Sequence, residues 1–599
     1  MGMDRFEENL KLLRQADPAL ANRVSGVPFP ENILVVHARD GSPVPKLRQI
    51  TLHSAYHPVK EAARTVSQFE RPEGYQTVVY GLGFGYHVLA LLRTQPGIIT
   101  VIEPLMPMFR AFLSHADLSL YLPRVRFIIG ESGTKIIARH QGLSWNVFEH
   151  RPSLQLAETY FDELERGREL LEFLGRSRLR ILVVPPIYGG SLPTARYCAR
   201  ALENLGHHVS LVECERFEEG FFALRQTSRN KAHTEVLNNK FMDLMGQVVA
   251  ARAAEFQPDL VLALAQAPLS PKTIASLKSL RVPVAFWFVE DFRTLPYWKD
   301  VAGHYDHFFP IQRGEFFEKL RAAGCPDAYY LPQACSLETH RPLRLSPEEL
   351  GAYSADLSFM GAGYYNRKMA FPRLLDFDFK IWGTGWELES ILGPHIQNGS
   401  QHVPTEEAVK IYNAGRINLN LHSSNWHNGV NPEGDFVNPR TFEIAACGGF
   451  QLVDERSELQ ELFVADKEIV TFGTLDELRD RVAYYLEHEE ERHRISALAR
   501  ARVFAEHTME HRMNEMLLHI YLHRLEELEV RLHGRKSELD IAIEQAGPET
   551  ELGQFLGQFR DTPDFSFKKI IQHIESGKGA LSETETLLLT LNQVIKEGK

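Results

Sequence analysis

The sequence predicts an α/β protein with three parallel sheets in succession and a helical C-terminal extension. Three segments repeat the pattern of a buried strand, a glycine-containing turn and a helix, and they start at Thr77, Leu179 and Ala355. Strands that alternate with helices pair in parallel, so each segment predicts one Rossmann-like domain. At 599 residues the chain is also too long for one hydrophobic core. We therefore expect four parts, at residues 1–175, 176–340, 341–520 and 521–599.

The composition is that of an ordinary globular protein, with 44% hydrophobic and 24% charged residues. The formal net charge of -12 lacks the basic excess that nucleic-acid binding needs. The first residues contain no apolar signal region, and no stretch reaches the roughly 20 uninterrupted apolar residues of a membrane span. We expect a cytoplasmic protein that binds no nucleic acid and crosses no membrane.

The spacing of cysteines and histidines predicts neither a disulfide framework nor a metal site. The five cysteines are scattered without paired spacing. Three pairs of histidines stand four residues apart, but none has the His-Glu-x-x-His form, and no third ligand or general base is evident near any pair. These pairs are His53 with His57, His507 with His511, and His519 with His523. We expect packing or surface histidines and no metal requirement.

The first sheet begins with a candidate ligand site. The segment Thr77–Tyr80 is typical of a buried strand, Gly81-Leu-Gly-Phe-Gly85 of a turn, and residues 88–92 of a helix. Small residues at such a turn let a ligand approach the backbone at the helix N-terminus. Glu103 ends the next strand, 22 residues after Gly81, where an acid that binds ribose is expected. We therefore expect Gly81, Gly83, Gly85 and Glu103 to form a ligand site, with tight packing of the turn as the alternative.

This unit resembles the Rossmann-like domain of S-adenosylmethionine-dependent methyltransferases, although Val79 stands where those enzymes usually carry an acidic residue. The stretch His53-Ser-Ala-Tyr-His-Pro-Val-Lys-Glu-Ala62, followed by Tyr80-Gly-Leu-Gly-Phe-Gly85, is similar to the N-terminal region of bacterial motility accessory factors, which glycosylate flagellin. The resemblance leaves three alternatives: a working methyltransferase that binds S-adenosylmethionine, a degenerate or docking domain, and an unassigned ligand site.

The second sheet places two glycines and two acids at one edge. A strand at residues 179–186 leads into the loop with Gly189 and Gly190, and a later strand, Val284–Val289, ends in Glu290 and Asp291. Ligands of open parallel sheets bind outside the carboxyl ends of the strands, so these residues should line one crevice. The two acids could serve the hydroxyl of an acceptor; the alternative is a solvated pair that caps the next element.

The third sheet predicts an anion site. The strand Ala355–Met360 runs into a turn with Gly361 and Gly363, and Arg367 opens the following helix. Further on, Asn438 is a good N-cap and Pro439 suits the first helical position, so a helix should begin there with its positive dipole end exposed. Arg440 and Glu443 share one face of that helix, which would put a cation for phosphate beside an acceptor for sugar hydroxyls. Gly448 and Gly449 should end the helix.

Five motifs in this order resemble the CgeB-like group of bacterial glycosyltransferases, named for a spore-maturation protein, over roughly residues 179 to 522. The resemblance implies the glycosyltransferase B fold, with two facing Rossmann-like domains. The motifs are Phe286-Trp-Phe-Val-Glu-Asp291, Leu357-Ser-Phe-Met-Gly-Ala-Gly363, Tyr412-Asn-Ala-Gly-Arg-Ile-Asn-Leu-Asn-Leu-His422, Asn438-Pro-Arg-Thr-Phe-Glu443 with Ala446-Cys-Gly-Gly-Phe450, and His507-Thr-Met-Glu-His-Arg512.

The resemblance also implies roles for single residues. Arg440 would face the diphosphate of a nucleotide-sugar donor, of the UDP type, and Glu443 would approach its ribose. Asp435 stands eight positions before Glu443, where related retaining enzymes often carry an acid that contacts the transferred sugar. The other donor-binding residues would be Gly189, Gly190, Gly361, Gly363, Arg367, Gly448 and Gly449. An arginine and a helix N-terminus can stabilise the charge of a leaving diphosphate without a metal.

The sequence therefore predicts a metal-independent glycosyltransferase that moves a sugar from a nucleotide donor to a cytoplasmic acceptor, either a protein such as flagellin or a glycan. The catalytic candidates are Asp435, Glu290 and Asp291; retention of configuration fits the acid spacing, with Asp291 as an inverting base left open. Two alternatives remain: a non-catalytic scaffold that only binds nucleotide sugars, and a bifunctional protein with a methyltransferase in front. The charged helices of the tail predict packing or homo-oligomerisation.

Overall fold

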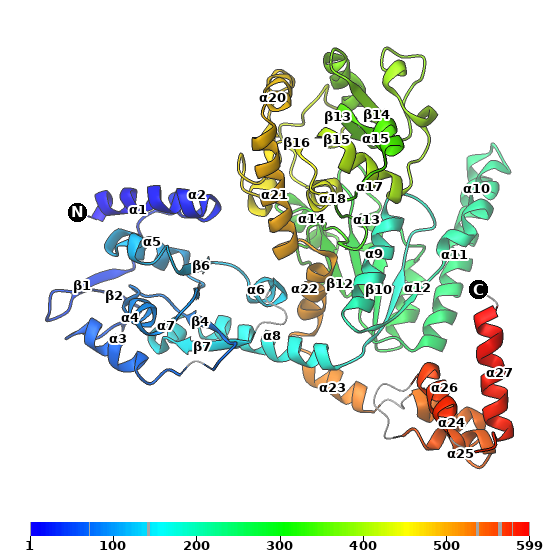
Figure 1. The fold of residues 1–599 in the computed structure, drawn as a ribbon, viewed down its shortest axis with the longest axis horizontal. Coiled ribbons are helices and arrows are strands. Elements are labelled where there is room, and N and C mark those ends of the chain that lie inside the picture. Colours follow the sequence, from blue (N-terminus) through cyan, green and yellow to red (C-terminus); the bar gives the residue numbers. More distant parts are fainter. Residues whose placement is uncertain are drawn as a thin grey trace. The chain divides into compact units, whose positions relative to one another are not determined.

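A computed structural model describes residues 2–70, 72–139, 144–534, 538–560, 566–577 and 579–597. The chain forms two compact units, Met1–Leu522 and His523–Lys599. The first unit contains three parallel sheets and the second only helices (Figure 1). The predicted fold class, α/β with two Rossmann-like sheets after a first one and a helical C-terminal extension, is confirmed. Among the described residues no helix is long and apolar enough to cross a membrane.

The N-terminal part combines a small antiparallel sheet with a four-stranded parallel one, whose strand order is β6-β5-β4-β7. Helix α1 packs on α5, as Figure 1 shows. The strands are β1 (Leu34–His37), β2 (Pro43–Leu47), β3 (Ile50–Thr51), β4 (Gln76–Tyr80), β5 (Ile99–Glu103), β6 (Val125–Ile129) and β7 (Trp145–Glu149). The helices are α1 (Gly2–Ala16), α2 (Pro18–Ser25), α3 (Pro58–Val66), α4 (Tyr86–Thr94), α5 (Met106–His115), α6 (Gly133–Arg139), α7 (Arg151–Leu156) and α8 (Glu158–Arg176).

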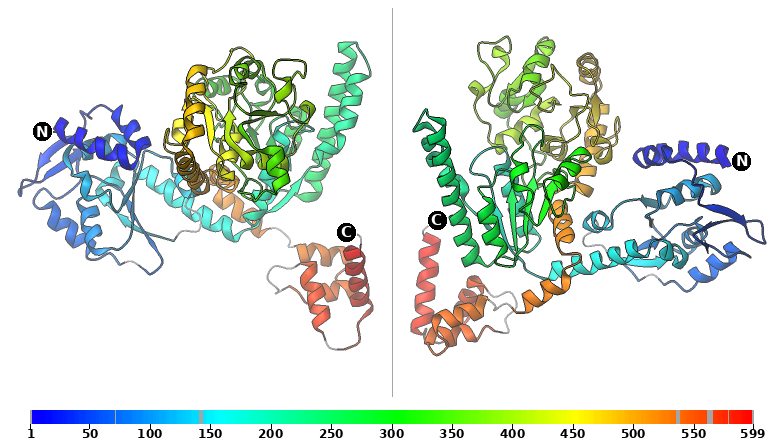
Figure 2. Two further views of the ribbon diagram at one scale, coloured as in Figure 1. Left: turned by 45° about the horizontal axis from the view of Figure 1, so that its top comes forward. Right: turned by 180° about the vertical axis from the view of Figure 1, so that it is seen from behind.

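The second parallel sheet has the order β12-β11-β10-β8-β9. Every residue of β10 and β11 is buried, because helices cover both faces of the sheet. The strands are β8 (Arg180–Val184), β9 (His208–Leu211), β10 (Leu260–Leu264), β11 (Val284–Phe288) and β12 (His307–Pro310). The helices are α9 (Ser191–Asn204), α10 (Glu218–Gln226), α11 (Lys231–Phe256), α12 (Pro271–Lys278), α13 (Trp298–Val301) and α14 (Glu315–Ala322). Figure 2 shows α10 and α11 as a hairpin that projects from this domain.

The third parallel sheet, β14-β13-β15-β16-β17, repeats the strand order of the second one. In both sheets the third strand pairs with the first, so the direction of winding reverses between them, which is where such sheets bind ligands. The strands are β13 (Ala355–Met360), β14 (Phe379–Trp382), β15 (Gly415–Asn420), β16 (Gln451–Asp454) and β17 (Val470–Phe472). The helices are α15 (Pro347–Tyr353), α16 (Tyr365–Ala370), α17 (Thr405–Ala414), α18 (Pro439–Cys447), α19 (Leu459–Leu462), α20 (Leu475–Glu487), α21 (Glu489–Glu506) and α22 (Met509–Tyr521).

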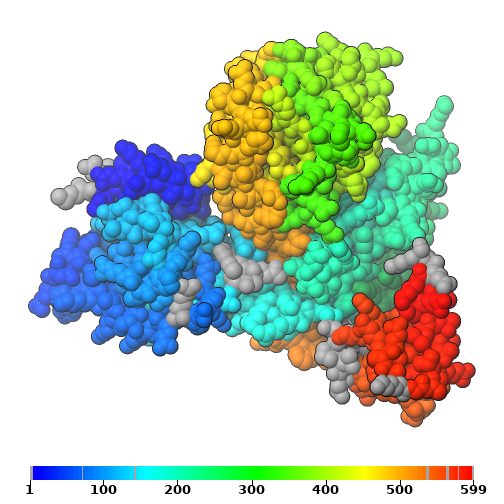
Figure 3. Space-filling model, viewed as in Figure 1, coloured from blue at the N-terminus to red at the C-terminus, as the bar shows by residue number. Residues whose placement is uncertain are grey.

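Helix α22 returns from the third sheet to the second and packs against α9. The chain therefore passes between these two domains twice, and the two passages are joined by backbone hydrogen bonds. The Cys335 N–H donates to the His507 carbonyl at 3.2 Å, and the Met509 N–H donates to the Cys335 carbonyl at 2.8 Å. Figure 3 shows the two domains in contact along the face in view.

The helical unit has a core of its own, formed by buried residues such as Ile543, Phe555 and Ile571. Its last helix exposes Leu587, Leu591 and Val594 along one side. Homo-oligomerisation through this tail stays a prediction. The helices are α23 (Leu525–His533), α24 (Glu538–Ala546), α25 (Glu551–Gly557), α26 (Phe567–Ser576) and α27 (Glu583–Glu597).

Side chains of the same domain pack against the glycine turn of the N-terminal part, where a ligand site is expected. A Cβ atom on Gly81 would lie 2.1 Å from the Ser153 Cβ, and one on Gly83 would lie 2.6 Å from the His53 Nε2. The side chain of Tyr121 fills the space beside Gly85 in the same way. A side chain at any of these three positions would clash, so close packing of the turn requires the glycines, and a ligand site there stays a prediction.

Glu103 connects the end of β5 to this turn and to the loop that follows β5. Its carboxylate accepts hydrogen bonds from the Leu82 N–H at 2.9 Å and the Leu105 N–H at 3.0 Å. The side chain is buried, and burial raises its pKa to about 7. The contact of Glu103 with a ribose, and with it the methyltransferase alternative, stays a prediction.

Three buried histidines pack around this turn. The imidazole nitrogens of His53, His87 and His150 lie within 4.8 Å of one another. The rings of His87 and His150 stack at 4.2 Å with an interplanar angle of 7°, so their in-plane lone pairs cannot converge on one ion. His53 Nε2 accepts from the Phe84 N–H at 2.9 Å, and His150 Nδ1 lies 2.7 Å from the Ser153 Oγ. We interpret the cluster as packing of neutral rings.

This packing predicts a pH-dependent loss of stability. Burial lowers the pKa of His87 to about 4. The neutral ring therefore makes its full contribution to the free energy of unfolding above pH 6.5, and this contribution is lost as the pH falls toward 4. Between pH 7 and pH 5 wild-type protein should lose about 2 kcal/mol relative to the His87→Phe variant, which keeps the stacked ring. Thermal unfolding of both proteins at the two pH values measures this.

The comparison between variants is needed because Glu103, with its raised pKa, titrates in the opposite sense over the same range. His233→Asn changes an exposed histidine of α11 and should follow the wild type at both pH values. Equal pH dependence in wild type and His87→Phe would contradict the prediction.

Candidate functional site

An acid of the second parallel sheet and an acid of the third domain approach each other near the carboxyl ends of β11 and β12. Gln312 follows β12 and is fully buried. Its Nε2 donates to Asp291 Oδ1 at 3.0 Å and to Asp435 Oδ1 at 2.8 Å. A side-chain amide carries two N–H hydrogens, so it can serve both carboxylates. Gln312 thereby links Asp291, which follows β11, to Asp435, which lies in the loop before α18.

Arg293 balances the charge of this pair of acids. Its Nη1 lies 3.0 Å from Asp435 Oδ2 and 3.9 Å from Asp291 Oδ1. Thr294 Oγ1 donates to the other oxygen of Asp291 at 2.8 Å. A cation and an amide donor thus contact both carboxylates and offset their like charge.

Glu290 has hydrogen-bond partners of its own, separate from those of this pair. Gln266 Nε2 donates to one of its carboxylate oxygens at 2.5 Å, and the Tyr297 hydroxyl donates to the other at 3.0 Å. Burial raises the pKa of Glu290. The two adjacent acids predicted as catalysts thus have separate surroundings, and only Asp291 faces Asp435.

Helix α18 begins as predicted, with Asn438 as its N-cap and Pro439 in the first position. Asn438 Oδ1 accepts from the Thr441 N–H at 3.2 Å, and the Asn438 Nδ2 donates to Asn420 Oδ1 at 2.8 Å. The backbone at the helix start is also fixed, because the Asn438 N–H donates to His422 Nε2 at 2.9 Å.

A buried histidine and aspartate orient this helix start. His422 Nδ1 lies 2.6 Å from Asp454 Oδ1, and neither side chain has any exposed surface. Burial lowers the pKa of His422 to about 4, so the ring is neutral, donates from Nδ1 and accepts at Nε2. Burial alone would raise the pKa of Asp454, but Arg456 and His422 hold it below its usual range. The N-terminus of α18 therefore has a fixed position.

Arg440 and Glu443 lie on α18 beside the first glycine turn. Arg440 Nη1 donates to the Met360 carbonyl at 2.7 Å, and a Cβ atom on Gly361 would lie 2.7 Å from that nitrogen. Burial lowers the pKa of Arg440. Glu443 accepts from the Tyr412 hydroxyl at 3.4 Å and lies 3.7 Å from His340 Nε2. The structure thus brings Gly361, Arg440 and Glu443 together, and their predicted roles stay predictions.

Arg367 does not have the position predicted for a phosphate ligand. Its guanidinium is 3% exposed and donates twice to the Leu421 carbonyl, at 3.0 and 2.8 Å, and once to the Ala362 carbonyl at 2.8 Å. These bonds tie the glycine turn to the end of β15. Arg367 therefore holds the turn in place, and we do not include it among the donor-binding residues.

Gly448 and Gly449 also need correction as donor-binding residues. They end α18, as their place in the sequence indicated, with Gly448 in the left-handed region at φ 77°. They lie at the opposite end of this nine-residue helix from Asn438, at least about 15 Å away. A Cβ atom on Gly449 would lie 2.8 Å from the Tyr412 carbonyl oxygen, so its role is close packing.

Gly189 and Gly190 precede α9 and have nothing within 4 Å of the positions where side chains would stand. The loop after β8 is therefore open to a ligand, as predicted, but its contact with a donor stays a prediction. On the third sheet, a Cβ atom on Gly363 would lie 2.5 Å from the Gly385 carbonyl oxygen, which brings the two glycine turns of that sheet together.

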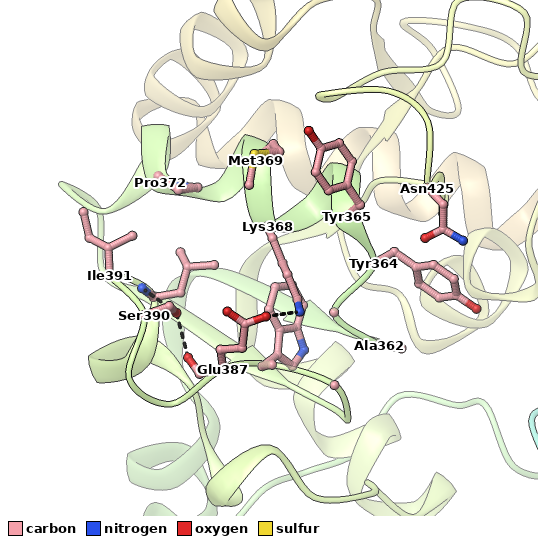
Figure 4. Close-up of a pocket in the computed structure, with 14 residues that line it drawn as sticks. Ala362, Tyr364, Tyr365, Lys368, Met369, Pro372, Glu387, Ser390, Ile391 and Asn425 are labelled. Atoms are coloured by element: carbon pink, nitrogen blue, oxygen red, sulfur yellow. Dashed lines mark hydrogen bonds and ion pairs between the residues drawn. The ribbon is translucent and has the colours of Figure 1, made fainter.

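A pocket of about 640 Å³ lies beside these two turns, between α16 and the loop after β14 (Figure 4). Lys368 and Glu387 point toward each other in its middle, with 2.7 Å between Lys368 Nζ and Glu387 Oε1. Tyr364 and Asn425 lie at one end of the view, and Pro372 and Ile391 at the other. Its walls contain ring and aliphatic surface next to polar side chains, which suits an organic ligand.

Sequence reasoning missed Gln312, Arg293 and the histidine at position 422. Gln312 lies shortly after the end of β12, and Arg293 lies shortly after the end of β11, next to Asp291. The position after a buried strand, which identified Asp291 as a candidate, could therefore have identified both residues. His422 was seen only as part of a motif, because its partners Asp454 and Asn438 are 32 and 16 residues away in the chain.

Comparisons with known proteins agree with the resemblance seen in the motifs. Residues 367–518 match a family model described as glycosyl transferase-like. The chain is 27% identical over 259 residues to the spore protein CgeB of Bacillus subtilis (strain 168), which covers 40% of this chain and 76% of the relative. The predicted resemblance to CgeB-like glycosyltransferases is thereby confirmed.

Solved structures also resemble the chain. Sucrose-phosphate synthase from Thermosynechococcus elongatus is 13% identical with a TM-score of 0.40, over 59% of this chain and 99% of that one. Anabaena Alr3699/HepE, in complex with UDP and glucose, is 10% identical with a TM-score of 0.39, over 59% and 100%. The fold assignment rests on the strand order of the two sheets rather than on these similarities.

The capping of α18 yields a test of stability. Asn438→Ala removes the cap and leaves Asn420 Oδ1 without its donor, so the free energy of unfolding should fall by about 2–3 kcal/mol. Urea unfolding of the full chain measures the change. Asn239→Ala, at an exposed position of α11, should stay within about 0.5 kcal/mol of the wild type. Similar unfolding of both variants would show that the buried network does not depend on the cap.

Proposed function

We propose that this chain, which is similar to CgeB-like glycosyltransferases, transfers a sugar from a nucleotide-sugar donor to a hydroxyl group of an acceptor. The observation that carries the proposal is the fixed start of α18. This start fixes the helix that carries Arg440 and Glu443. A cation, the N-terminus of a helix and a carboxylate in this order match a diphosphate followed by a ribose.

On the donor side, Arg440 and the N-terminus of α18 bind the diphosphate, and Glu443 accepts hydrogen bonds from the ribose hydroxyls. Arg440 makes one backbone hydrogen bond, to Met360, and is half-buried, so its charge acts in a medium of low dielectric. The positive charge of the arginine and the helix dipole offsets the charge that develops on the leaving diphosphate. We therefore propose a reaction that needs no metal, with a UDP-type donor.

Asp435 and Asp291 flank the place of the transferred sugar. The bond between the anomeric carbon and the diphosphate oxygen breaks, and the acceptor oxygen forms the new bond to that carbon. In a retaining reaction the acceptor attacks from the side of the leaving group, and its proton passes to the departing diphosphate. Asp435, held by Gln312 and Arg293, then positions the sugar.

The acceptor approaches from the side of Gly189, Gly190 and Asp291. The N-terminal resemblance to motility accessory factors supports a protein acceptor such as flagellin, and a glycan is the alternative. We place the reaction in the cytoplasm. The packed glycine turn of the N-terminal part favours a docking role for that part over a second enzymatic activity.

Substitutions on α18 test the donor side. Arg440→Ala should lower kcat/KM for hydrolysis or transfer of the donor about 10²–10³-fold, because it removes charge at the leaving group. Glu443→Ala should mainly raise the KM for the donor, since it removes binding to the ribose. A panel of nucleotide sugars assayed with full-length protein measures both effects.

Arg373→Ala and Glu490→Ala remove exposed charges of the same domain and should match the wild type. Wild-type turnover in the two α18 variants would refute the donor site. Donor binding without turnover in any acceptor screen would instead favour the non-catalytic scaffold.

The role of Asp435 has a separate test. Asp435→Asn should lower kcat about 10²-fold and leave the Kd for the donor nearly unchanged, because the carboxylate contacts the sugar rather than the nucleotide. NMR of the first-formed product should show the same anomeric configuration as the donor. An inverted product would refute retention and would assign Asp291 as the base instead.

A further inference from the structure

A second pocket lies in the first glycosyltransferase-like domain, at the carboxyl ends of β8 and β10. Its volume is about 290 Å³. These two strands are neighbours in the sheet but are separated by β9 in the chain, so the pocket is at the point where the direction of winding reverses. Ligands of open parallel sheets bind at this point. The fold therefore places a cavity where an acceptor would enter.

The walls of this pocket are rich in rings. Tyr188, from the loop after β8, lies 5.5 Å from Phe221 between ring centroids, and Tyr305 stacks on Phe286 at 4.6 Å. Met242 on α11 completes the lining. Aromatic rings pair favourably at centroid distances of about 4.5–7 Å, and methionine sulfur also contacts rings favourably. A planar aromatic guest suits these walls better than a sugar, whose hydroxyl groups would lose their hydrogen bonds to water.

The α10–α11 hairpin forms the outer wall. It supplies Phe221 and Met242, both half-buried, and α10 has no fully buried residue. Figures 1 and 2 show this hairpin projecting from the domain. The pocket is therefore bounded on one side by the sheet and on the other by an element that a long acceptor chain can reach.

The mouth of the pocket is polar and adjoins Glu290. Tyr297, which lines the pocket, donates its hydroxyl to Glu290 at 3.0 Å and accepts from the Gln266 N–H at 2.8 Å. Gln266 also lines the pocket and has a φ of 63°, in the left-handed region that a residue with a side chain rarely adopts. Such strained residues cluster at binding and catalytic sites. The apolar walls thus end beside a carboxylate that can accept a hydrogen bond from a hydroxyl group.

We infer that this pocket binds an aromatic ring of the acceptor, and that the hydroxyl group that receives the sugar stands next to this ring, at Glu290. In a peptide the ring is the side chain beside a serine or threonine. Glu290 is then a positioning residue that accepts a hydrogen bond from the hydroxyl, while the transfer step is the one given above. The role of the ring as part of an acceptor rests on the proposed function. Binding of the ring to the pocket does not, because it can be measured without any donor.

The test compares two probes that differ by one ring. The dipeptides N-acetyl-Phe-Ser-amide and N-acetyl-Ala-Ser-amide are titrated into the full-length protein without donor and followed by saturation-transfer NMR. We expect the phenylalanine probe to bind at least tenfold more tightly. Ala267→Phe places a ring in the pocket and should reduce this preference to less than twofold. Ala251→Phe makes the same change at an exposed position of α11 and should keep the wild-type preference.

A second variant guards against misfolding of the first. Phe221→Ala removes part of the outer wall from a half-buried position and should also weaken the preference for the ring. Equal binding of the two dipeptides to wild type, or a preference that survives in both Ala267→Phe and Phe221→Ala, would overturn the inference. Donor hydrolysis by wild type is assayed separately; its failure together with an intact ring preference would refute the proposed function and leave the pocket assignment standing.

Discussion

The start of α18, the proposed donor site, depends on one buried chain of hydrogen bonds, from Asp454 through His422 to the backbone of Asn438. The charge of Asp454 is offset by Arg456, and the aspartate in turn fixes which nitrogen of His422 carries the proton. A ring protonated on both nitrogens could not accept from Asn438. The helix that carries Arg440 and Glu443 is thus oriented by groups that no ligand touches, as preorganised sites require.

The place of the two acids is built differently, because two of its polar groups sit directly on strand ends. Asp291 and Gln312 follow neighbouring parallel strands, so the sheet itself fixes their separation. Asp435 comes from a loop and reaches its place through Gln312 and Arg293. The ends of two paired strands therefore position the loop that carries Asp435, beside the proposed place of the sugar.

The fold could be predicted because strand periodicity and helix signals are local, and the start of α18 could be predicted because a cap and a proline are adjacent in the chain. The glycine turns show the limit. Gly81–Gly85 and Gly361–Gly363 have the same pattern, but His53 and Ser153 fill the first, while Arg440 lies beside the second. The residues that pack against each turn come from outside the motif. The sequence of the turn alone therefore cannot distinguish the surroundings of the two turns. The buried guanidinium of Arg367 was missed for the same reason, since its carbonyl partner Leu421 is 54 residues away.

The double passage of the chain between the two glycosyltransferase-like domains has a mechanical consequence. Cys335 on the outward passage is hydrogen-bonded to the backbone around Thr508 on the return, so both connections cross at one place. Two connections at one place act as a single hinge, whereas two separated ones would resist rotation. A rotation of the two domains should therefore turn about Cys335 and Thr508 and break contacts between them, such as the one between Arg293 and Asp435.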